Sequence, residues 1–279
     1  MSKVDFMCVG APKSGTTWLY QILDQHPDIF IPKEKELHYF NSLHPETYLP
    51  NRNFNNGIDW YHSFFKNCDE DKLKADFSTS YLVDPGMAEK LYEYNKDLKI
   101  LIILRNPVFR AWSHFRFLQS RGMLKSDDFF IESARNKSIL NAGRYADPIR
   151  SFQLKFPPDQ MRIIFYEELS NPAILINDLT RFLKVSDFEP KGLLDKTNQT
   201  KAIKNNLLHK VVTHAKHSVV GKAIKKLKLD GLLNHFYTIN SMEKRPIEIP
   251  EDIELYLREN YEEDIAKLSD VLGRKVWEL

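Results

Sequence analysis

The sequence predicts an α/β fold in which a P-loop-like parallel β-sheet is flanked by helices on both faces. Short apolar runs alternate with segments of helical period along the 279-residue chain. This alternation is typical of a parallel sheet covered by helices. The first apolar run leads directly into a glycine-containing loop, Gly10-Ala-Pro-Lys-Ser-Gly15, which opens a helical segment. No repeat or low-complexity tract divides the chain, so we expect a single domain over residues 1–279.

The expected elements follow from hydrophobic periodicity and from helix boundary signals. Four apolar runs are expected to form buried strands, at residues 4–9, 74–77, 100–104 and 161–166. The intervening periodic segments are expected to form helices, at residues 16–25, 86–95, 107–119, 172–183 and 251–272. The first of these helices should stop at His26-Pro27. Asn106 is a suitable N-cap for the third, with Pro107 at its first position.

The overall charge gives no general case for nucleic-acid binding. Lys and Arg number 40 and Asp and Glu 38, for a net charge of +2. One stretch, residues 201–245, carries ten Lys/Arg against two Asp/Glu, so it has a local net charge of +8. A solvated helical face explains such a run, and a surface that meets an anionic partner is the alternative.

The chain is expected to be cytoplasmic. Its two cysteines, Cys8 and Cys68, are too few for a disulfide framework. No segment reaches the roughly 18 consecutive apolar residues of a membrane span. The run Lys222–Lys228 is basic and amphipathic, which leaves a weak peripheral membrane contact open beside a soluble helix. The oligomeric state is not determined by these features.

The loop at residues 10–15 has the GxxxxG spacing of a phosphate-binding loop but lacks its usual lysine. Thr16 and Thr17 follow Gly15, where a nucleotide triphosphatase has Lys then Ser/Thr. The strand at 100–104 ends in Arg105, not in the Asp that would hold magnesium. Backbone N–H groups, two hydroxyls and a helix N-terminus remain to bind a compact anion. Arg105 suits a second phosphate. The pattern indicates a nucleotide with phosphates at two ends and no metal.

Two stretches, "PKSGTTWL" at 12–19 and "LIILRNPVFRAWSHF" at 101–115, resemble the sulfotransferase superfamily. Its members use 3′-phosphoadenosine 5′-phosphosulfate (PAPS) as sulfuryl donor and release 3′-phosphoadenosine 5′-phosphate (PAP). The resemblance extends from Phe6 to the final "LGRKVWEL". It implies PAPS as co-substrate and no metal requirement.

The resemblance also implies roles for individual residues. Lys13 would bind the 5′-phosphosulfate and neutralise the leaving phosphate oxygen. Arg105 and Ser113 match the pair that binds the 3′-phosphate. Trp18 and Tyr166 match residues that contact adenine, although a core position explains Trp18 equally well. The remaining donor contacts implied are Ser14, Gly15, Thr16 and Thr17 around the phosphosulfate, and Lys201 in "NQTK", where Ala202 replaces the usual glycine.

Cytosolic members take their general base, a histidine, from the segment that here reads "KADFSTSYL" and contains none. Glycan-modifying members, such as heparan sulfate sulfotransferases, place a glutamate in a context similar to "KELHYF" at 35–40. By that resemblance Glu36 is the base and His38 assists it, and both would face one pocket if the backbone is extended. A surface position in the charged run is the competing interpretation of Glu36. Asp76 matches an acceptor-site acid, but the lysine normally beside it is Phe77.

The sequence therefore predicts a PAPS-dependent sulfotransferase that modifies a hydroxyl or amino group. A carbohydrate or polysaccharide is the favoured acceptor, and a small-molecule or lipid-like natural product is the alternative. A P-loop nucleotide kinase is a distant alternative, which the substitutions at Thr16 and Arg105 disfavour. A binding module that holds PAP without transfer is a further one.

Overall fold

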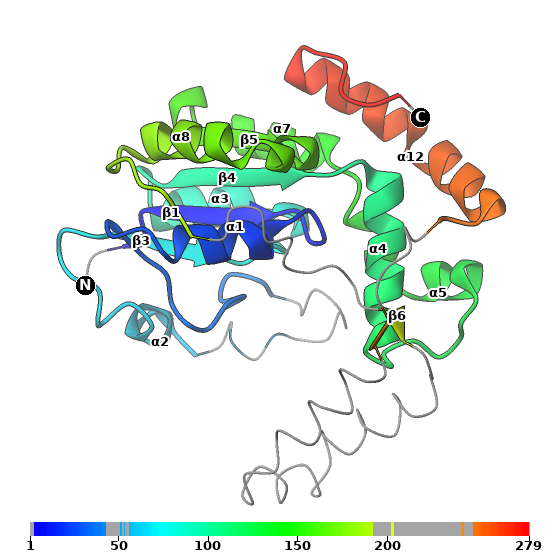
Figure 1. Cartoon of the computed structure of the whole chain (residues 1–279), viewed down its shortest axis with the longest axis horizontal. Helices are drawn as coiled ribbons and strands as arrows, with labels where there is room; N and C mark the ends of the chain where they lie inside the picture. The colour runs from blue at the N-terminus through cyan, green and yellow to red at the C-terminus, as the bar shows by residue number, and fades with distance from the viewer. Residues whose placement is uncertain are drawn as a thin grey trace, which may run out of the picture.

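A computed structural model describes residues 3–42, 51, 53, 56–191, 202–203, 241–242 and 248–278. Its centre is a five-stranded sheet in the order β2-β3-β1-β4-β5, seen across the middle of Figure 1. All four neighbouring pairs in this sheet are parallel. The strands are β1 (Phe6–Gly10), β2 (Ile29–Phe30), β3 (Leu73–Phe77), β4 (Lys99–Leu104) and β5 (Met161–Phe165). Short β6 (Ala202–Ile203) and β7 (Ser241–Met242) form a separate antiparallel pair.

Helices connect the strands of the main sheet and extend beyond it. The α-helices are α1 (Thr16–Leu23), α2 (Ile58–Ser63), α3 (Met87–Tyr94), α4 (Pro107–Ser120), α5 (Phe129–Arg135), α6 (Ser138–Asn141), α7 (Ala146–Gln153), α8 (Pro172–Leu183) and α12 (Glu251–Leu272). Single 3₁₀ turns are η2 (Tyr81–Val83), η3 (Pro158–Gln160) and η4 (Tyr166–Ser170). Within the described ranges, no helix combines the length and apolar character needed to cross a membrane.

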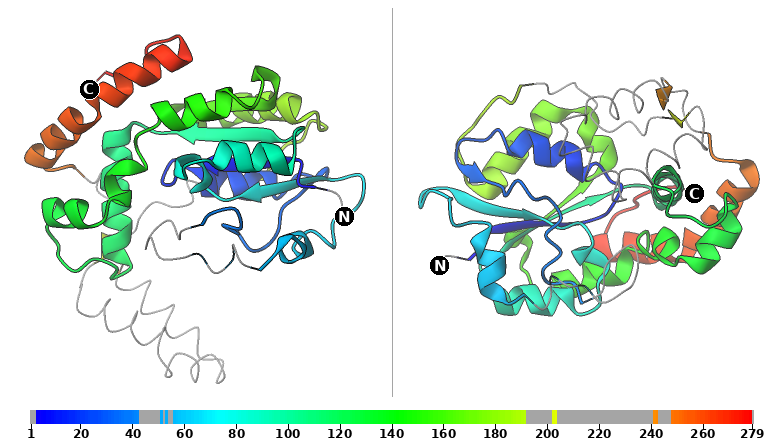
Figure 2. Two further views of the ribbon diagram at one scale, coloured as in Figure 1. Left: turned by 180° about the vertical axis from the view of Figure 1, so that it is seen from behind. Right: turned by 90° about the horizontal axis from the view of Figure 1, so that it is seen from below.

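Helices lie on both faces of the sheet, as the view along it in Figure 2 shows. On one face α1 and α8 bury side chains such as Leu19 and Leu179 against the strands. On the other face α3 and α7 bury Leu91 and Phe152. Because apolar side chains are removed from water on both faces, the central strands β1 and β4 are nearly continuous apolar runs and do not alternate.

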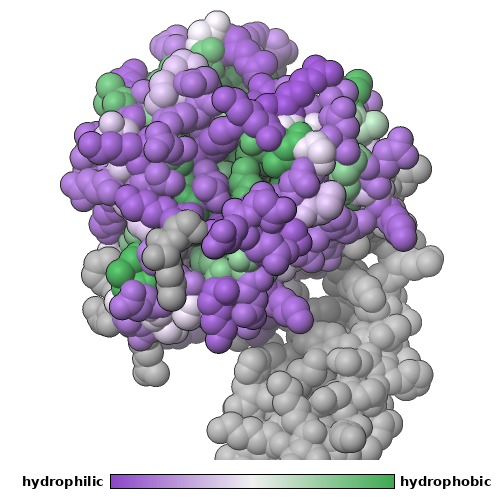
Figure 3. Space-filling model, turned by 90° about the vertical axis from the view of Figure 1, so that its left-hand side faces the viewer, coloured by the Kyte–Doolittle hydropathy of each residue, from purple (hydrophilic) through white to green (hydrophobic). Residues whose placement is uncertain are grey.

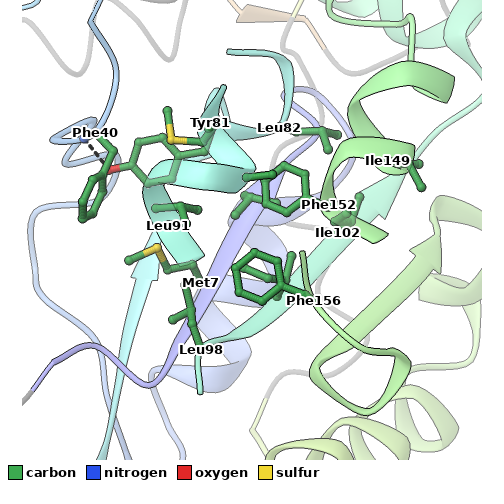
Figure 4. Close-up of a cluster of buried hydrophobic side chains, with 14 of the residues drawn as sticks. Met7, Phe40, Tyr81, Leu82, Leu91, Leu98, Ile102, Ile149, Phe152 and Phe156 are labelled. Atoms are coloured by element: carbon green, nitrogen blue, oxygen red, sulfur yellow. Dashed lines mark hydrogen bonds between the residues drawn. The ribbon is translucent and has the colours of Figure 1, made fainter. Parts of the chain in front are cut away.

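The core on the α3–α7 face joins the sheet to the segments that follow β2 and β3. Figure 4 shows Phe40 and Tyr81 packed edge to face in this cluster, with Leu91 and Phe152 nearby. The Tyr81 hydroxyl accepts a hydrogen bond from the Phe40 backbone N–H at 3.3 Å. This contact ties the loop after β2 to the turn after β3.

A second helical group extends the domain beyond the carboxyl end of β4. Helices α4, α5 and α6 pack with the long α12 around residues such as Phe115 and Leu257. The Tyr261 hydroxyl of α12 donates to the Leu140 carbonyl at 2.7 Å. The opposite side of the molecule, which carries the N-terminus, is mainly hydrophilic, with small hydrophobic areas between the polar side chains (Figure 3).

The predicted fold class is confirmed, and each of the four predicted strands is present. Helices α8 and α12 have the predicted bounds. Asn106 caps α4 as expected, since its Oδ1 accepts from the Val108 N–H at 3.0 Å. The sequence did not indicate β2, α2 or the short helices α5 to α7. Each of these is eight residues or fewer, which is too short for a clear hydrophobic period.

Candidate active site

The polar residues singled out in the sequence follow the carboxyl ends of adjacent strands. The glycine-containing loop follows β1, Arg105 follows β4 and Tyr166 follows β5. Thr79, which the sequence analysis did not single out, follows β3. The sheet is parallel, so these ends meet at one edge, the position where open α/β sheets bind ligands.

The loop between β1 and α1 turns through two left-handed residues. Lys13 has φ 70° and Gly15 has φ 91°. A Cβ built on Gly15 would lie 2.4 Å from Leu169 Cδ1, so glycine is required for space as well as for φ. The turn leaves backbone N–H groups and the N-terminus of α1 to bind an anion.

The Lys13 side chain reaches from this loop toward α4. Its ammonium lies 4.1 Å from the centroid of the Phe117 ring. Ser113 lies one turn before Phe117, on the same side of the helix, and is partly exposed. Lys13, predicted to bind the 5′-phosphosulfate, and Ser113, predicted to bind the 3′-phosphate with Arg105, therefore lie on the same side of α4.

Arg105 is held close to the loop by three contacts. Its Nη1 donates to the Lys13 carbonyl at 3.2 Å, and its guanidinium lies 4.6 Å from the centroid of the Tyr166 ring. The Tyr145 hydroxyl donates to the Arg105 carbonyl at 2.9 Å. Burial lowers the pKa of Arg105, with nearby Tyr166 opposing that shift. Within the described residues no carboxylate lies in ion-pair range of this guanidinium, so its charge suits an anionic ligand.

One buried polar group supports a phosphate ligand at the loop. The Ser14 side chain is fully buried, and its hydroxyl has no hydrogen-bond partner of normal geometry in the described part of the chain. A buried hydroxyl without a partner is unfavourable. The hydroxyl, the loop N–H groups and the cations Lys13 and Arg105 together fit a nucleotide with phosphates at two ends.

Glu36 lies at the neighbouring strand end and is bound by Thr79. The Thr79 backbone N–H donates to Glu36 Oε2 at 2.8 Å, and the Thr79 hydroxyl lies 3.0 Å from Oε1. Lys35 Nζ lies 3.2 Å from the same Oε1. The Glu36 side chain is 28% exposed. It is therefore fixed in position and still accessible to a ligand, unlike a freely solvated surface acid.

His38 faces Glu36, and a chain of hydrogen bonds fixes its tautomer. Asn41 Nδ2 donates to Asp84 at 2.7 Å, so Asn41 Oδ1 is the acceptor for the Ser80 hydroxyl at 2.7 Å. That hydroxyl has one proton, so His38 Nδ1, 2.8 Å away, donates to it. Nε2 is then directed at Glu36 Oε2, 3.7 Å away. The two groups are therefore in ion-pair range but beyond the distance of a direct hydrogen bond.

Asp76 lies behind this pair and is almost fully buried. Its carboxylate accepts from the Ser78 hydroxyl at 2.8 Å and from the Tyr61 hydroxyl at 3.0 Å. Burial raises the pKa of Asp76 to about 6, the hydroxyl donors oppose that shift, and the Glu36 charge adds to it. The Ser78 hydroxyl also accepts from the His38 backbone N–H at 3.1 Å. In this arrangement Asp76 supports the loop that carries His38.

The structure corrects the expected backbone at Glu36 and His38. They have φ 65° and 50°, so the segment is not extended. Their side chains still converge, because a turn and the hydroxyls of residues 78–80 direct them.

Trp18 is 9% exposed and packs among core residues, which leaves little of its ring for adenine. Lys201 lies outside the described residues, so its role stays a prediction. Thr16 is buried at the start of α1.

Sequence reasoning missed Lys35 and the hydroxyl series Ser78, Thr79 and Ser80. Lys35 Nζ donates to the Thr17 hydroxyl at 2.9 Å, in addition to its contact with Glu36. This lysine connects the loop to the proposed base. Only the segment "FSTS" after an apolar strand, a run of hydroxyls at a carboxyl end, could have drawn attention to the series.

Residues 3–231 match the family model for the sulfotransferase domain. The match covers most of the chain, and the motifs that it includes form the site described above. The chain therefore belongs to the sulfotransferase family.

Among curated proteins, residues of this chain are 34% identical over 116 positions to the membrane-associated sulfotransferase kil1 of Dictyostelium discoideum, covering 40% of this chain and 22% of kil1. They are 31% identical over 202 positions to the human bifunctional heparan sulfate N-deacetylase/N-sulfotransferase 3, covering 64% of this chain and 22% of that protein. The matched region is thus about a quarter of the length of these relatives.

Among solved structures, a sulfotransferase from Alicyclobacillus acidocaldarius has a TM-score of 0.71 and 24% identity, and the match covers 99% of this chain and 98% of that one. The sulfotransferase domain from the curacin biosynthetic pathway has a TM-score of 0.53 and 17% identity, covering 94% and 98%. Both show that the fold is shared over nearly the whole chain.

Proposed function

We propose that this sulfotransferase moves the sulfuryl group of PAPS to a hydroxyl or amino group of a carbohydrate, with Glu36 as general base. One observation carries the proposal: the Glu36 carboxylate is fixed beside the donor loop, joined to Thr17 through Lys35. A base at that place can take the acceptor proton while the acceptor attacks in line with the leaving phosphate.

The donor side of the reaction is assigned to the loop and the β4 end. Lys13 would neutralise the charge that develops on the 5′-phosphate oxygen when its bond to sulfur breaks. Arg105, with Ser113, would hold the 3′-phosphate. Tyr166 is 39% exposed and stacked on Arg105, so its ring can also contact the adenine.

On the acceptor side, His38 assists Glu36. Its Nδ1 is fixed by Ser80, and its Nε2 faces the Glu36 carboxylate. After Glu36 has taken the acceptor proton, His38 can pass it to water. Asp76 holds the supporting loop through Ser78 and does not need to contact the acceptor.

A carbohydrate acceptor is supported by the kind of base and by the relatives. The Glu36–His38 pair lies in a context resembling glycan-modifying enzymes. Relatives with matching segments include the human heparan sulfate glucosamine 3-O-sulfotransferase 5, 28% identical over 107 residues. The basic stretch at 201–245 would bind an anionic glycan, although almost all of it lies outside the described residues.

The test is a transfer assay with ³⁵S-labelled PAPS against heparosan, desulfated heparin, chondroitin, 4-nitrophenol and long-chain alcohols, with and without EDTA. We expect label on a glycan, undiminished by EDTA. Label on a phenol or alcohol alone would replace the glycan with a small-molecule or lipid-like acceptor. Magnesium-dependent turnover of ATP without sulfuryl transfer would contradict the proposal.

We also propose a cytoplasmic location, which the reduced state of both cysteines supports. Cys8 and Cys68 are free, and burial raises the pKa of the Cys8 thiol to about 12, so it is unreactive. Fractionation of the source cells should find the activity in the soluble fraction. Recovery in membranes, released by salt, would instead favour a peripheral contact through the basic run at 222–228, which lies outside the described residues.

A further inference from the structure

Lys35 is the cation that links the two halves of the site. It donates to the Thr17 hydroxyl of the donor loop at 2.9 Å and lies 3.2 Å from the Glu36 carboxylate. Its side chain is 19% exposed, so it is largely enclosed but still open on one side. An ammonium has three donor protons, and these two contacts account for two of them.

The position of Lys35 is fixed by the surrounding chain. The Glu36 N–H donates to the Phe77 carbonyl at 3.1 Å, and the Tyr20 hydroxyl donates to the Pro32 carbonyl at 3.1 Å. The segment 32–36 is thus bound to β3 on one side and to α1 on the other. The Lys35 ammonium is itself held by Thr17 and Glu36, so the side chain loses little entropy when it binds a ligand.

The end of β3 offers no cation to the reacting group. Phe77 occupies the position where the resemblance leads one to expect a lysine. It is 2% exposed and packs edge to face on Phe6 and Tyr20. Lys35, on the neighbouring segment, places a positive charge between the donor loop and Glu36.

We propose that Lys35 is a catalytic residue whose ammonium binds the non-bridging oxygens of the sulfuryl group during transfer. The sulfuryl group moves from the phosphate at the loop toward an acceptor whose proton goes to Glu36, and Lys35 touches both ends of that path. This inference rests on the proposed function, because it requires PAPS at the loop and an acceptor at Glu36.

The step balances without a further reactant. The acceptor oxygen or nitrogen forms a bond to sulfur, and its proton passes to the Glu36 carboxylate. The bond between sulfur and the 5′-phosphate oxygen breaks, and its electron pair stays on that oxygen. Sulfated acceptor and PAP are the products. Lys35 remains protonated throughout and stabilises charge on the sulfuryl oxygens.

The variant Lys35→Met tests this role, and Lys33→Met is its matched control. Lys33 is an exposed lysine two residues earlier on the same segment. We expect Lys35→Met to lower kcat by about 100-fold or more, as for the loss of one electrostatic donor. Its affinity for PAP, which has no sulfuryl group, should stay within about 3-fold of wild type by calorimetry, while its affinity for PAPS falls. Lys33→Met should match wild type in kcat, in PAP affinity and in PAPS affinity.

The variant Lys35→Arg and the pH dependence of kcat distinguish a catalytic role of Lys35 from a role in keeping Glu36 ionised. Lys35→Arg keeps the charge and should recover at least about 10-fold over Lys35→Met. If Lys35 served only to keep Glu36 ionised, the loss in Lys35→Met would vanish at high pH, and that result would overturn the proposal. A kcat of Lys35→Met within about 3-fold of wild type would also overturn the proposal. Should Lys35→Met fail to fold, Lys35→Gln takes its place.

The failure of this inference differs from failure of the proposed function. The slow hydrolysis of PAPS to PAP and sulfate needs no acceptor, so it reports on Lys35 even if the acceptor class is wrong. Loss of this hydrolysis in Lys35→Met, together with normal transfer in Glu36→Gln, would contradict Glu36 as the general base and support the catalytic role of Lys35. Unchanged hydrolysis in Lys35→Met, together with loss of transfer in Glu36→Gln, would contradict the catalytic role of Lys35 and support Glu36 as the general base.

Discussion

The donor and acceptor halves of the site use opposite chemistry at the same edge of one sheet. At the ends of β1 and β4, the cation Arg105 contacts a ring and a backbone carbonyl. At the end of β3, the carboxylates Glu36 and Asp76 are held by hydroxyl groups. Among the described residues Arg105 has no carboxylate partner, so it can accept an anion without first breaking an ion pair, and the second half keeps its carboxylate in place. In the proposed mechanism, function is therefore divided between a half that binds the donor and a half that transfers protons.

The largest effect should come from removing the base in the acceptor half. Glu36→Gln keeps the side-chain shape but cannot take a proton. We expect kcat for sulfuryl transfer to fall by about 10²–10⁴-fold, with PAP affinity unchanged in calorimetry. Glu34→Gln, an exposed acid on the same segment, should behave as wild type. Equal activity in Glu36→Gln and Glu34→Gln would show that the two halves are not divided in this way.

Substitutions in the donor half should change the affinity for PAP. Arg105→Met removes the guanidinium assigned to the 3′-phosphate and should weaken PAP binding by roughly 10- to 100-fold, the value of a charge-assisted contact. Arg105→Lys should be intermediate, because an ammonium lacks the planar fork. The exposed Arg150 of α7 supplies a control, Arg150→Met. If Arg105→Met bound PAP with the affinity of wild type, the 3′-phosphate would have to be bound by residues other than Arg105.

The loop geometry can be tested separately from its charges. Gly15→Ala combines an unfavourable φ with a clash against Leu169, whereas Gly86→Ala, at φ 76°, meets open space. Gly86→Ala should reduce the free energy of unfolding by about 1–2 kcal/mol, and Gly15→Ala should reduce it further. Urea denaturation of both variants measures the difference. Equal losses would mean that Leu169 moves aside without cost.

The smallest effect concerns Asp76, whose pKa is raised in the folded state. Such a group binds its proton more tightly when folded, so the stabilisation is complete below the ordinary pKa and is lost as pH rises to about 6. The free energy of unfolding should therefore fall relative to Asp76→Asn between about pH 4 and pH 6. Urea titrations of both proteins at several pH values measure this slope. A constant difference would place the Asp76 pKa near its ordinary value.

Local signals in the sequence were sufficient for the donor half. The loop at 10–15 and the segment from Arg105 to Ser113 each contain their functional residues in one short stretch next to a predicted strand. The parallel sheet then had to bring those strand ends together, and Arg105 does contact Lys13. The acceptor half was predicted for Glu36 and His38 through resemblance alone, and their backbone was expected to be extended.

The amino-acid sequence by itself determined the fold class, the strands β1, β3, β4 and β5, the helices α8 and α12, and the residue types at the strand ends, because periodicity and capping act over a few neighbours. Only the tertiary structure decided that Lys35 reaches Thr17, that Ser78, Thr79 and Ser80 hold three different side chains, and that Asp76 is buried. The contacts of Lys35, Thr79 and Ser80 join residues 18 to 43 positions apart. They depend on how two loops pack across the edge of the sheet, and no local pattern specifies that arrangement.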